Sequence, residues 1–218
     1  MLPANSLTSL NWKNIDLVKI RVLILGFSLT FLFATTGCAQ GKDKECNGFF
    51  RWDVKTLTDS NGMDLLPKPP TDSTISQLVS VQPPVRMSVL SKKDRRLPRF
   101  DSEKHLVRVI AIIEEINIQA DEDYHVVLRS PYSKTSMIGE IPDPGCAYFS
   151  AFPILKDKFT TVRKQGDSVW QQLKKTKTPV LVEITGVPFW DAPHFWLKGS
   201  SKTGREIHPI LNIRILGK

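Results

Sequence analysis

The chain has 218 residues, a formal net charge of +8 and a hydrophobic content of 41%. Without its first 37 residues it keeps about 180, which is room for one domain with an arm but not for several domains. The positive charge, +6 of which remains after that segment, favours an acidic partner or a membrane surface without identifying either. The chain contains no G-x-S-x-G, H-E-x-x-H, P-loop or dinucleotide-binding signature, which argues against those enzyme classes.

The N-terminal segment has the pattern of an export signal. Lys19 and Arg21 are followed by an apolar run over residues 22–34, which is shorter than the about 20 residues that a membrane-spanning helix needs. A positive flank, a short apolar core and the small residues 35–37 are typical of secretory signal peptides. We therefore predict a signal peptide over residues 1–37.

Cys38 follows this segment, and two cleavage sites fit the pattern. A lipoprotein peptidase would cut before Cys38 and leave a lipid-modified cysteine, which would anchor the protein to a membrane of the cell envelope. An ordinary signal peptidase would cut after Ala39 and leave a soluble periplasmic or secreted protein. We expect the lipoprotein, with Thr35 in place of the aliphatic residue that usually stands three positions before a lipidated cysteine.

The remaining cysteines are Cys46 and Cys146. They are a candidate disulfide pair, which an oxidising compartment would permit. A zinc site made of cysteines is not expected, because no Cys-x-x-Cys or Cys-x-x-His spacing occurs.

Residues 38–100 are predicted to form a proline-rich, extended arm. Dense prolines exclude long helices there. The stretch RWDVKTLTD alternates like a strand, and its exposed aromatic residues would be costly, so we expect the arm to wrap against the domain. For the basic cluster near its end, we expect a solvated linker, with an anionic contact as the alternative. Its members are Lys92, Lys93, Arg95, Arg96 and Arg99.

The pattern changes to that of β-strands from Glu103 onward. Residues 105–118 are apolar on both alternate faces, which indicates a strand buried on both sides or one that changes face at a bulge near Glu114 and Glu115. The acidic stretch 121–123 signals a turn, and strands are expected over residues 124–129 and 135–141. Short turns between these three strands predict a meander.

The sequence PDPG at residues 142–145 ends the meander, because a central strand cannot contain these prolines. Helical spacing follows from Ile154. We expect Gly166 to interrupt this helix and Asp167 to cap a second short turn before Pro179. Two more strands are expected, over residues 180–187 and 207–216.

The order strand–strand–strand–helix–strand–strand, with a long first strand, is that of an OB-fold barrel. We therefore predict a mainly β protein in three parts: a signal peptide (1–37), a Pro-rich arm (38–100) and a small five-stranded OB-like barrel (101–218). One helical segment is expected between the third and fourth strands. A closed barrel leaves no free strand edges, which suits an exported monomer.

Five stretches of the chain carry a resemblance: RWDVKTLTD, DEDYHVVL, MIGEIPDPGC, VEITGVPFWDAPH and EIHPILNI. In their order and wording, over residues 46–216, the chain resembles a family of uncharacterised, mostly exported bacterial proteins with the motifs D-x-D-Y-H, I-P-D-P-x-C, T-G-V-x-F-F-D-x-x-H and E-L-H-P-V. It departs from them at residues 195–199, which replace a Gly-rich segment, and at Asn212, which replaces an aspartate. The resemblance implies export but no particular activity.

The polar residues of these motifs are candidates for a functional site. They lie near strand ends that a closed barrel could bring to one rim: Asp121, Asp123, His125, Asp191, His194, Glu206 and His208. Imidazole and carboxylate groups together suit divalent metals, and a metal could activate water for hydrolysis. The candidate metal ligands are His125, Asp191, His194 and His208. The alternative is that each of these side chains is structural.

A loop after the fourth strand combines aromatic and basic side chains, as the binding grooves of OB barrels do. Its members are Phe189, Trp190, Phe195, Trp196, Lys198, Lys202 and Arg205. Trp190 and Trp196 are candidate binding residues that would stack on a ligand; the alternative is ordinary packing against the core and the arm. Outside the cytoplasm, a glycan or a protein partner is expected in preference to nucleic acid.

These patterns favour an exported, lipid-anchored binding or interaction module, tethered to the membrane through Cys38. The competing hypothesis is a metal-dependent hydrolase with a His/Asp site at the barrel rim. The sequence does not identify a cofactor.

Overall fold

The structure is a computed structural model that describes residues 51–84, 96–192 and 197–217. All of these residues belong to one compact unit that begins at Gly41. The predicted signal peptide lies outside the described residues, and so do the site candidates Cys38, Cys46, His194 and Trp196.

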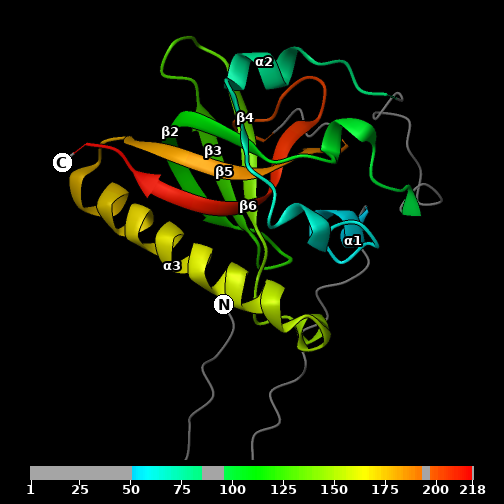
Figure 1. Cartoon of the computed structure of the whole chain (residues 1–218). Helices are drawn as coiled ribbons and strands as arrows, with labels where there is room; N and C mark the ends of the chain where they lie inside the picture. The colour runs from blue at the N-terminus through cyan, green and yellow to red at the C-terminus, as the bar shows by residue number, and fades with distance from the viewer. Residues whose placement is uncertain (1–50, 85–95, 193–196, 218) are drawn as a thin grey trace, which may run out of the picture. The chain divides into compact units, whose positions relative to one another are not determined.

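Five strands close into a mixed β-barrel (Figure 1). They are β2 (Val107–Ile118), β3 (Tyr124–Arg129), β4 (Ser136–Ile141), β5 (Val180–Trp190) and β6 (Arg205–Ile215). β2, β3 and β4 form the predicted antiparallel meander. β6 pairs with β4 in parallel and with β5 antiparallel, and β5 returns to β2 and closes the barrel. The prediction of a mainly β, five-stranded OB-like barrel is confirmed.

The bulge predicted in the first barrel strand is present. The pairing of β2 with β3 shifts register between Ile113 and Glu115. Before this point the odd-numbered residues of β2 are buried, and after it the buried residue is Ile116. A bulge bends a strand and turns its side chains to the other face, so the same long strand pairs with β5 through its first half and with β3 through its second.

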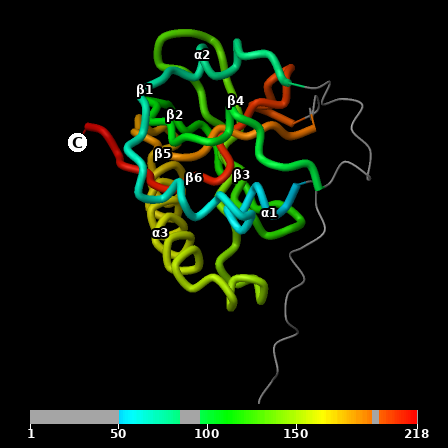
Figure 2. Tube along the Cα trace, turned by 45° about the vertical axis from the view of Figure 1, so that its right-hand side comes forward, coloured from blue at the N-terminus to red at the C-terminus, as the bar shows by residue number. Residues whose placement is uncertain are grey.

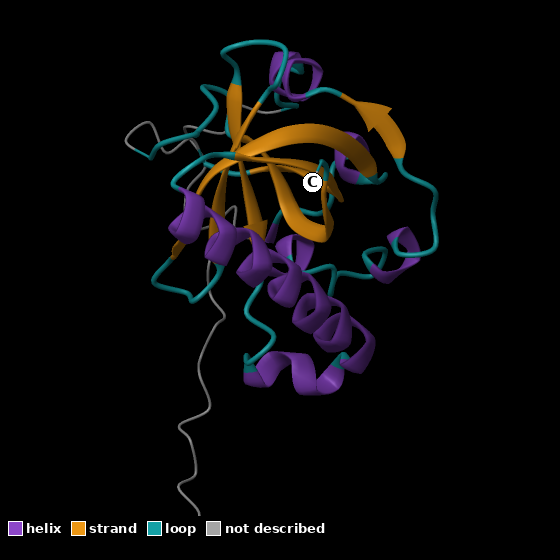
Figure 3. Cartoon of the chain, turned by 90° about the vertical axis from the view of Figure 1, so that its left-hand side faces the viewer, coloured by secondary structure: helices purple, strands orange, loops and turns teal. Residues whose placement is uncertain are grey.

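One helix, α3 (Pro153–Thr176), lies between β4 and β5 in the chain and packs against the barrel (Figure 3). The predicted break at Gly166 is wrong, because α3 continues through it. An added Cβ at Gly166 would stand 3.2 Å from Cδ1 of Ile141 and 3.4 Å from Cδ2 of Tyr124. Glycine therefore allows close contact between helix and barrel. Asp167 does not cap a turn; its side chain accepts a 2.7 Å hydrogen bond from the Tyr124 hydroxyl.

The described part of the arm contains short elements, among them α1 (Trp52–Lys55), β1 (Thr71–Ser73) and α2 (Ile75–Ser80). Single 3₁₀ turns occur at Met63–Leu65 and Asp101–Glu103. β1 adds a sixth, parallel strand beside the start of β2. α2 and α3 lie on opposite sides of the barrel, and Figure 2 shows the arm passing along it between α1 and α2.

The expectation that the arm packs against the barrel agrees with the structure of its described part. Trp52, Leu57, Leu65, Ile75 and Leu78 are buried in the same hydrophobic cluster as the barrel strands. The strand-like reading of RWDVKTLTD is wrong, because residues 52–55 form a helical turn. Trp52, Val54 and Lys55 of this turn are all buried, so its apolar residues do not have to lie on a single face of a helix. Their alternation in the sequence is therefore not the sign of a strand.

The basic cluster of the arm is not simply a solvated linker. Arg99 is only 5% exposed and donates to the Asp59 carboxylate at 2.6 Å and to the Val54 carbonyl at 2.8 Å. Three of the other cations, Lys92, Lys93 and Arg95, lie outside the described residues.

Among the described helices, none has the length and apolar character that crossing a membrane requires.

Candidate functional site

The barrel register places two polar side chains from different strands beside each other. β6 runs parallel to β4 with Gly139 opposite Ile207. Ile207 belongs to the core cluster, so its neighbour His208 points to the outside of the barrel, as Glu140 does on β4. Asp123 immediately precedes β3, which pairs with β4 on the other side. The fold therefore brings together Asp123 from the turn before β3, Glu140 from β4 and His208 from β6.

Asp123, Glu140 and His208 are the group of side chains, in the described part of the chain, whose ligand atoms could hold a metal ion. One ligand atom from each residue lies within 4.8 Å of the others. Nδ1 of His208 is 2.8 Å from Oε2 of Glu140, and its Nε2 is 3.8 Å from Oδ2 of Asp123. The imidazole ring packs edge-on against Phe189, with 5.7 Å between ring centroids. We call these three residues the rim cluster.

The two oxygens of Asp123 have different surroundings. Oδ1 accepts a 2.8 Å hydrogen bond from the backbone N–H of Asp143, which fixes the orientation of the carboxyl group. Oδ2 is buried and has no hydrogen-bond partner among the described residues. Neither ring nitrogen of His208 makes a hydrogen bond of regular geometry with any described residue. Buried polar atoms of this kind are uncommon in folded proteins and call for an explanation.

More charged side chains surround the rim cluster. Lys55 of α1 donates to Oδ2 of Asp191 at 2.6 Å, and Glu206 lies two residues before His208 with its Oε2 buried and unpartnered among the described residues. Lys55 comes from the arm, whereas Asp191 follows β5. The arm therefore contributes the lysine that stands among several barrel carboxylates.

The pKa values in this region reflect burial and neighbouring charge. Burial raises the pKa of Asp123 well above its usual value, and the nearby Asp121 and Glu140 add to this effect. Burial likewise raises the pKa of Glu206, assisted by Asp191 and Glu140. Burial opposes ionisation of Glu140 too, but the charges of His208 and Lys55 outweigh it and lower the pKa of Glu140 to about 2. Burial would lower the pKa of Lys55, yet the carboxylates, Asp191 first, raise it.

The structure brings some of the candidate site residues together and leaves others outside the rim cluster. Asp123 and His208 meet in the rim cluster, and Asp191 and Glu206 lie beside it. His125 is buried on β3 opposite Glu140 but is not part of the trio. Asp121 instead accepts the N–H of Asp123 within the turn at 3.2 Å.

The aromatic candidates that the structure describes have a packing role. Phe189 and Trp190 are completely buried. The indole N–H of Trp190 donates to Ser102 at 3.0 Å, and the Arg205 guanidinium lies 4.4 Å from the centre of its ring. Trp190 is therefore not available for stacking on a ligand in this structure, as the packing alternative supposed.

Glu140 and Lys55 were missed in the sequence. Glu140 sits within MIGEIPDPGC at a position that alternates with the core residues of its strand, which is the signal that could have found it. Lys55 carries no comparable signal, because its burial depends on the arm folding over the barrel. Cys146 is disulfide-bonded, and both other cysteines lie outside the described residues, so its pairing with Cys46 stays a prediction.

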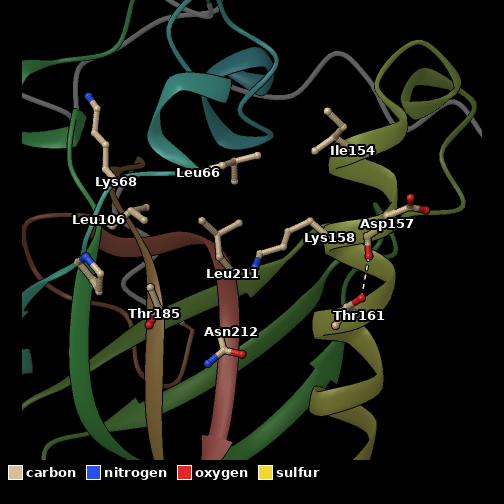
Figure 4. Close-up of a pocket in the computed structure, with 11 residues that line it drawn as sticks. Leu66, Lys68, Leu106, Ile154, Asp157, Lys158, Thr161, Thr185, Leu211 and Asn212 are labelled. Atoms are coloured by element: carbon tan, nitrogen blue, oxygen red, sulfur yellow. Dashed lines mark hydrogen bonds between the residues drawn. The ribbon is translucent and has the colours of Figure 1, made fainter.

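A groove of about 590 Å³ lies between α3, the barrel and the arm (Figure 4). Its apolar wall includes Leu66 of the arm, Leu106 before β2, Ile154 of α3 and Leu211 of β6. Lys158 extends from α3 toward Leu211 across this wall. A register shift leaves Leu211 as the extra residue between the pairs that β6 makes with Gly186 and Thr185, and such a bulge redirects side chains.

Compared with known proteins, the chain matches no protein-family model and no curated protein.

Proposed function

We propose that the protein is an exported binding module of OB-like fold, tethered to a membrane through a lipid on Cys38, that takes up a small amphipathic anion in the groove beside α3. The groove is the observation that carries this proposal. Its volume of about 590 Å³ is that of a small-molecule site, which typically encloses about 300–1,000 Å³. Sites of this kind combine an apolar lining with a few polar groups.

The lining of the groove indicates the chemistry of the ligand. Leu66, Leu106 and Leu211 offer apolar surface to a hydrocarbon or aromatic body, and Ile154 is 61% exposed although it is large and apolar. Lys158 has no ion-pair partner among the described residues and extends over the apolar wall. An anionic group on the ligand would meet this ammonium group while the apolar part packs below it.

The usual ligand face of an OB barrel supports the choice of the groove. That face is formed by the second and third barrel strands and nearby loops. Here the arm covers part of the corresponding region: α2 lies against β4, and Lys55 pairs at 2.6 Å with Asp191 at the start of the loop between β5 and β6. The arm thus occupies surface that a glycan or oligonucleotide would use, whereas the groove is open.

Binding of anilinonaphthalene sulfonate, an aromatic anion, to the purified full chain tests this proposal, with decanoate as the competitor. We expect saturable fluorescence that decanoate displaces. Lys158→Glu should weaken binding about five- to tenfold, because it replaces an attractive charge with a repulsive one. Lys164→Glu makes the same change on an exposed part of α3 outside the groove and is the matched control. No saturable binding, or equal weakening by both variants, would refute the groove as the site.

The export part of the proposal has a separate test. The intact mass of the mature protein distinguishes a diacylated chain that begins at Cys38 from an unmodified chain that begins after Ala39. Cys38→Ala should abolish the lipid-bearing mass and move the protein from the membrane fraction to the soluble fraction. A mature chain with an unmodified Cys38, or one that keeps its first 37 residues, would contradict the anchor.

A further inference from the structure

The rim cluster is distinct from the groove and calls for an explanation of its own. It presents two carboxylates and one imidazole, with one ligand atom of each within 4.8 Å of the others. Asp123 and His208 are fully buried, and the side chain of Glu140 is 12% exposed. Polar side chains are seldom gathered in this way in a protein interior unless they are paired or bind an ion.

The pairing within the rim cluster is incomplete. Oδ2 of Asp123 has no hydrogen-bond partner among the described residues, although it faces Nε2 of His208 at 3.8 Å. That distance is too long for a hydrogen bond. Two ligand atoms bound to one small metal ion are separated by about 3–4 Å when each is about 2.1 Å from the ion. The Asp123–His208 separation of 3.8 Å is therefore compatible with two ligands of one ion.

We propose that Asp123, Glu140 and His208 form a binding site for a divalent cation, with Zn²⁺ and Mn²⁺ as the ions that suit its donors. An imidazole nitrogen favours Zn²⁺ and related transition metals, whereas carboxylates also accept Mn²⁺. Mg²⁺ and Ca²⁺ prefer an all-oxygen set, so they should bind more weakly here. The inference does not depend on the groove or on its ligand.

The neighbours of these donors are arranged as those of metal ligands are. The backbone N–H of Asp143 holds the other oxygen of Asp123, and Phe189 supports the ring of His208. Contacts that orient the ligands in this way are a regular part of protein metal sites. A further 2.6 Å ion pair joins Lys55 to Asp191, so that the adjacent cation is already engaged by a carboxylate outside the trio.

Acidic groups also predominate around the rim cluster. The carboxyl groups of Asp123, Glu140, Asp191 and Glu206 are buried or nearly buried there together with Lys55 and His208, and His125 lies opposite Glu140 on β3. Glu206 keeps a buried, unpartnered Oε2 among the described residues but lies outside the trio. A divalent ion held by Asp123 and Glu140 would give these carboxyl groups the partner that their burial calls for.

The test uses the untagged full chain after removal of metal with a chelator. We expect calorimetric titration with ZnCl₂ or MnCl₂ to show one ion per chain and thermal unfolding to move to higher temperature, since an ion that binds only the folded state stabilises it. MgCl₂ at the same concentration should have the smaller effect. Asp123→Asn and Glu140→Gln should each weaken binding at least about tenfold.

Glu206→Gln is the matched control, because it removes a buried carboxylate of the same region that does not belong to the trio. It should bind Zn²⁺ and Mn²⁺ as the parent chain does. Absence of stoichiometric binding in the parent chain would overturn the proposal. Unchanged binding in both Asp123→Asn and Glu140→Gln would place the ion elsewhere and also overturn it. If Asp123→Asn does not fold, Glu140→Gln alone decides, since Glu140 is the least buried ligand.

Discussion

Two surfaces of the barrel differ in which side chains they bury and which they expose. Under the arm, around Arg51, Lys55 and the rim cluster, charged groups are buried. Beside α3, at the groove, the large apolar side chain of Ile154 is exposed. Buried charged groups call for an explanation, and so does an exposed apolar patch such as the wall of the groove, whereas a single exposed apolar side chain does not. The arm therefore buries charged groups against the barrel, whereas α3 leaves apolar surface of the groove exposed.

The largest effect on stability is expected from removing the buried ion pair between Arg51 and Glu103, on the side of the barrel that the arm covers. Glu103 accepts two hydrogen bonds from Arg51, at 2.8 and 2.6 Å, and two more from the backbone N–H groups of Phe100 and Trp190. Glu103→Ala leaves the Arg51 charge buried without its partner. The free energy of unfolding, measured in urea, should therefore fall by about 3–5 kcal/mol.

The matched control for this prediction is Asp101→Ala, which breaks an exposed ion pair with Lys104 in the same turn. It should leave the free energy of unfolding almost unchanged, because an exposed ion pair contributes little to stability. Equal effects of Glu103→Ala and Asp101→Ala would show that burial under the arm does not distinguish the two ion pairs.

A smaller loss is expected from the second ion pair on the side that the arm covers. Lys55→Met removes the partner of Asp191, which is only 4% exposed, and should cost about 2 kcal/mol in urea unfolding. The loss is smaller than for Glu103 because the Asp191 carboxylate that is left also accepts the N–H of Ala192. Adding Asp191→Asn should restore part of the stability, and a double-mutant cycle without coupling would contradict the pairing.

The smallest effect on stability is expected at the groove. Ile154→Ser should change the free energy of unfolding by less than about 0.5 kcal/mol, because this side chain is largely exposed already. It should still weaken the binding of anilinonaphthalene sulfonate about two- to fivefold, since it removes apolar surface from the groove. Ile118→Ser, at a 50% exposed residue outside the groove, is the control and should leave binding unchanged.

Much of the barrel could be predicted because its signals are local. The bulge near Glu114, the strand over residues 124–129 and the end of the meander at Pro142 follow from side-chain alternation and from proline geometry. The break at Gly166 was predicted wrongly by the same local reasoning. A glycine weakens an isolated helix by about 1 kcal/mol, but here its missing side chain allows α3 to approach Tyr124 and Ile141.

The candidate site could be predicted only in part. The motifs pointed to Asp123 and His208, and both belong to the rim cluster. Glu140 was not predicted, because a glutamate that alternates with apolar residues in a strand usually faces solvent. The lysine at position 55 could not be placed, because nothing in its own segment says that the segment folds over β5 and β6.

The sequence by itself determined which five segments become barrel strands and that a helix separates the third from the fourth, and it offered a bend near Glu114 as one of two interpretations of the first strand. These features depend on neighbouring residues, whose spacing and backbone preferences are written in the chain. Only the tertiary structure decided that Glu140 and His208 are neighbours and that Lys55 stands among carboxylates. Barrel closure and the packing of the arm join residues that are far apart in the chain, and no local pattern encodes that contact.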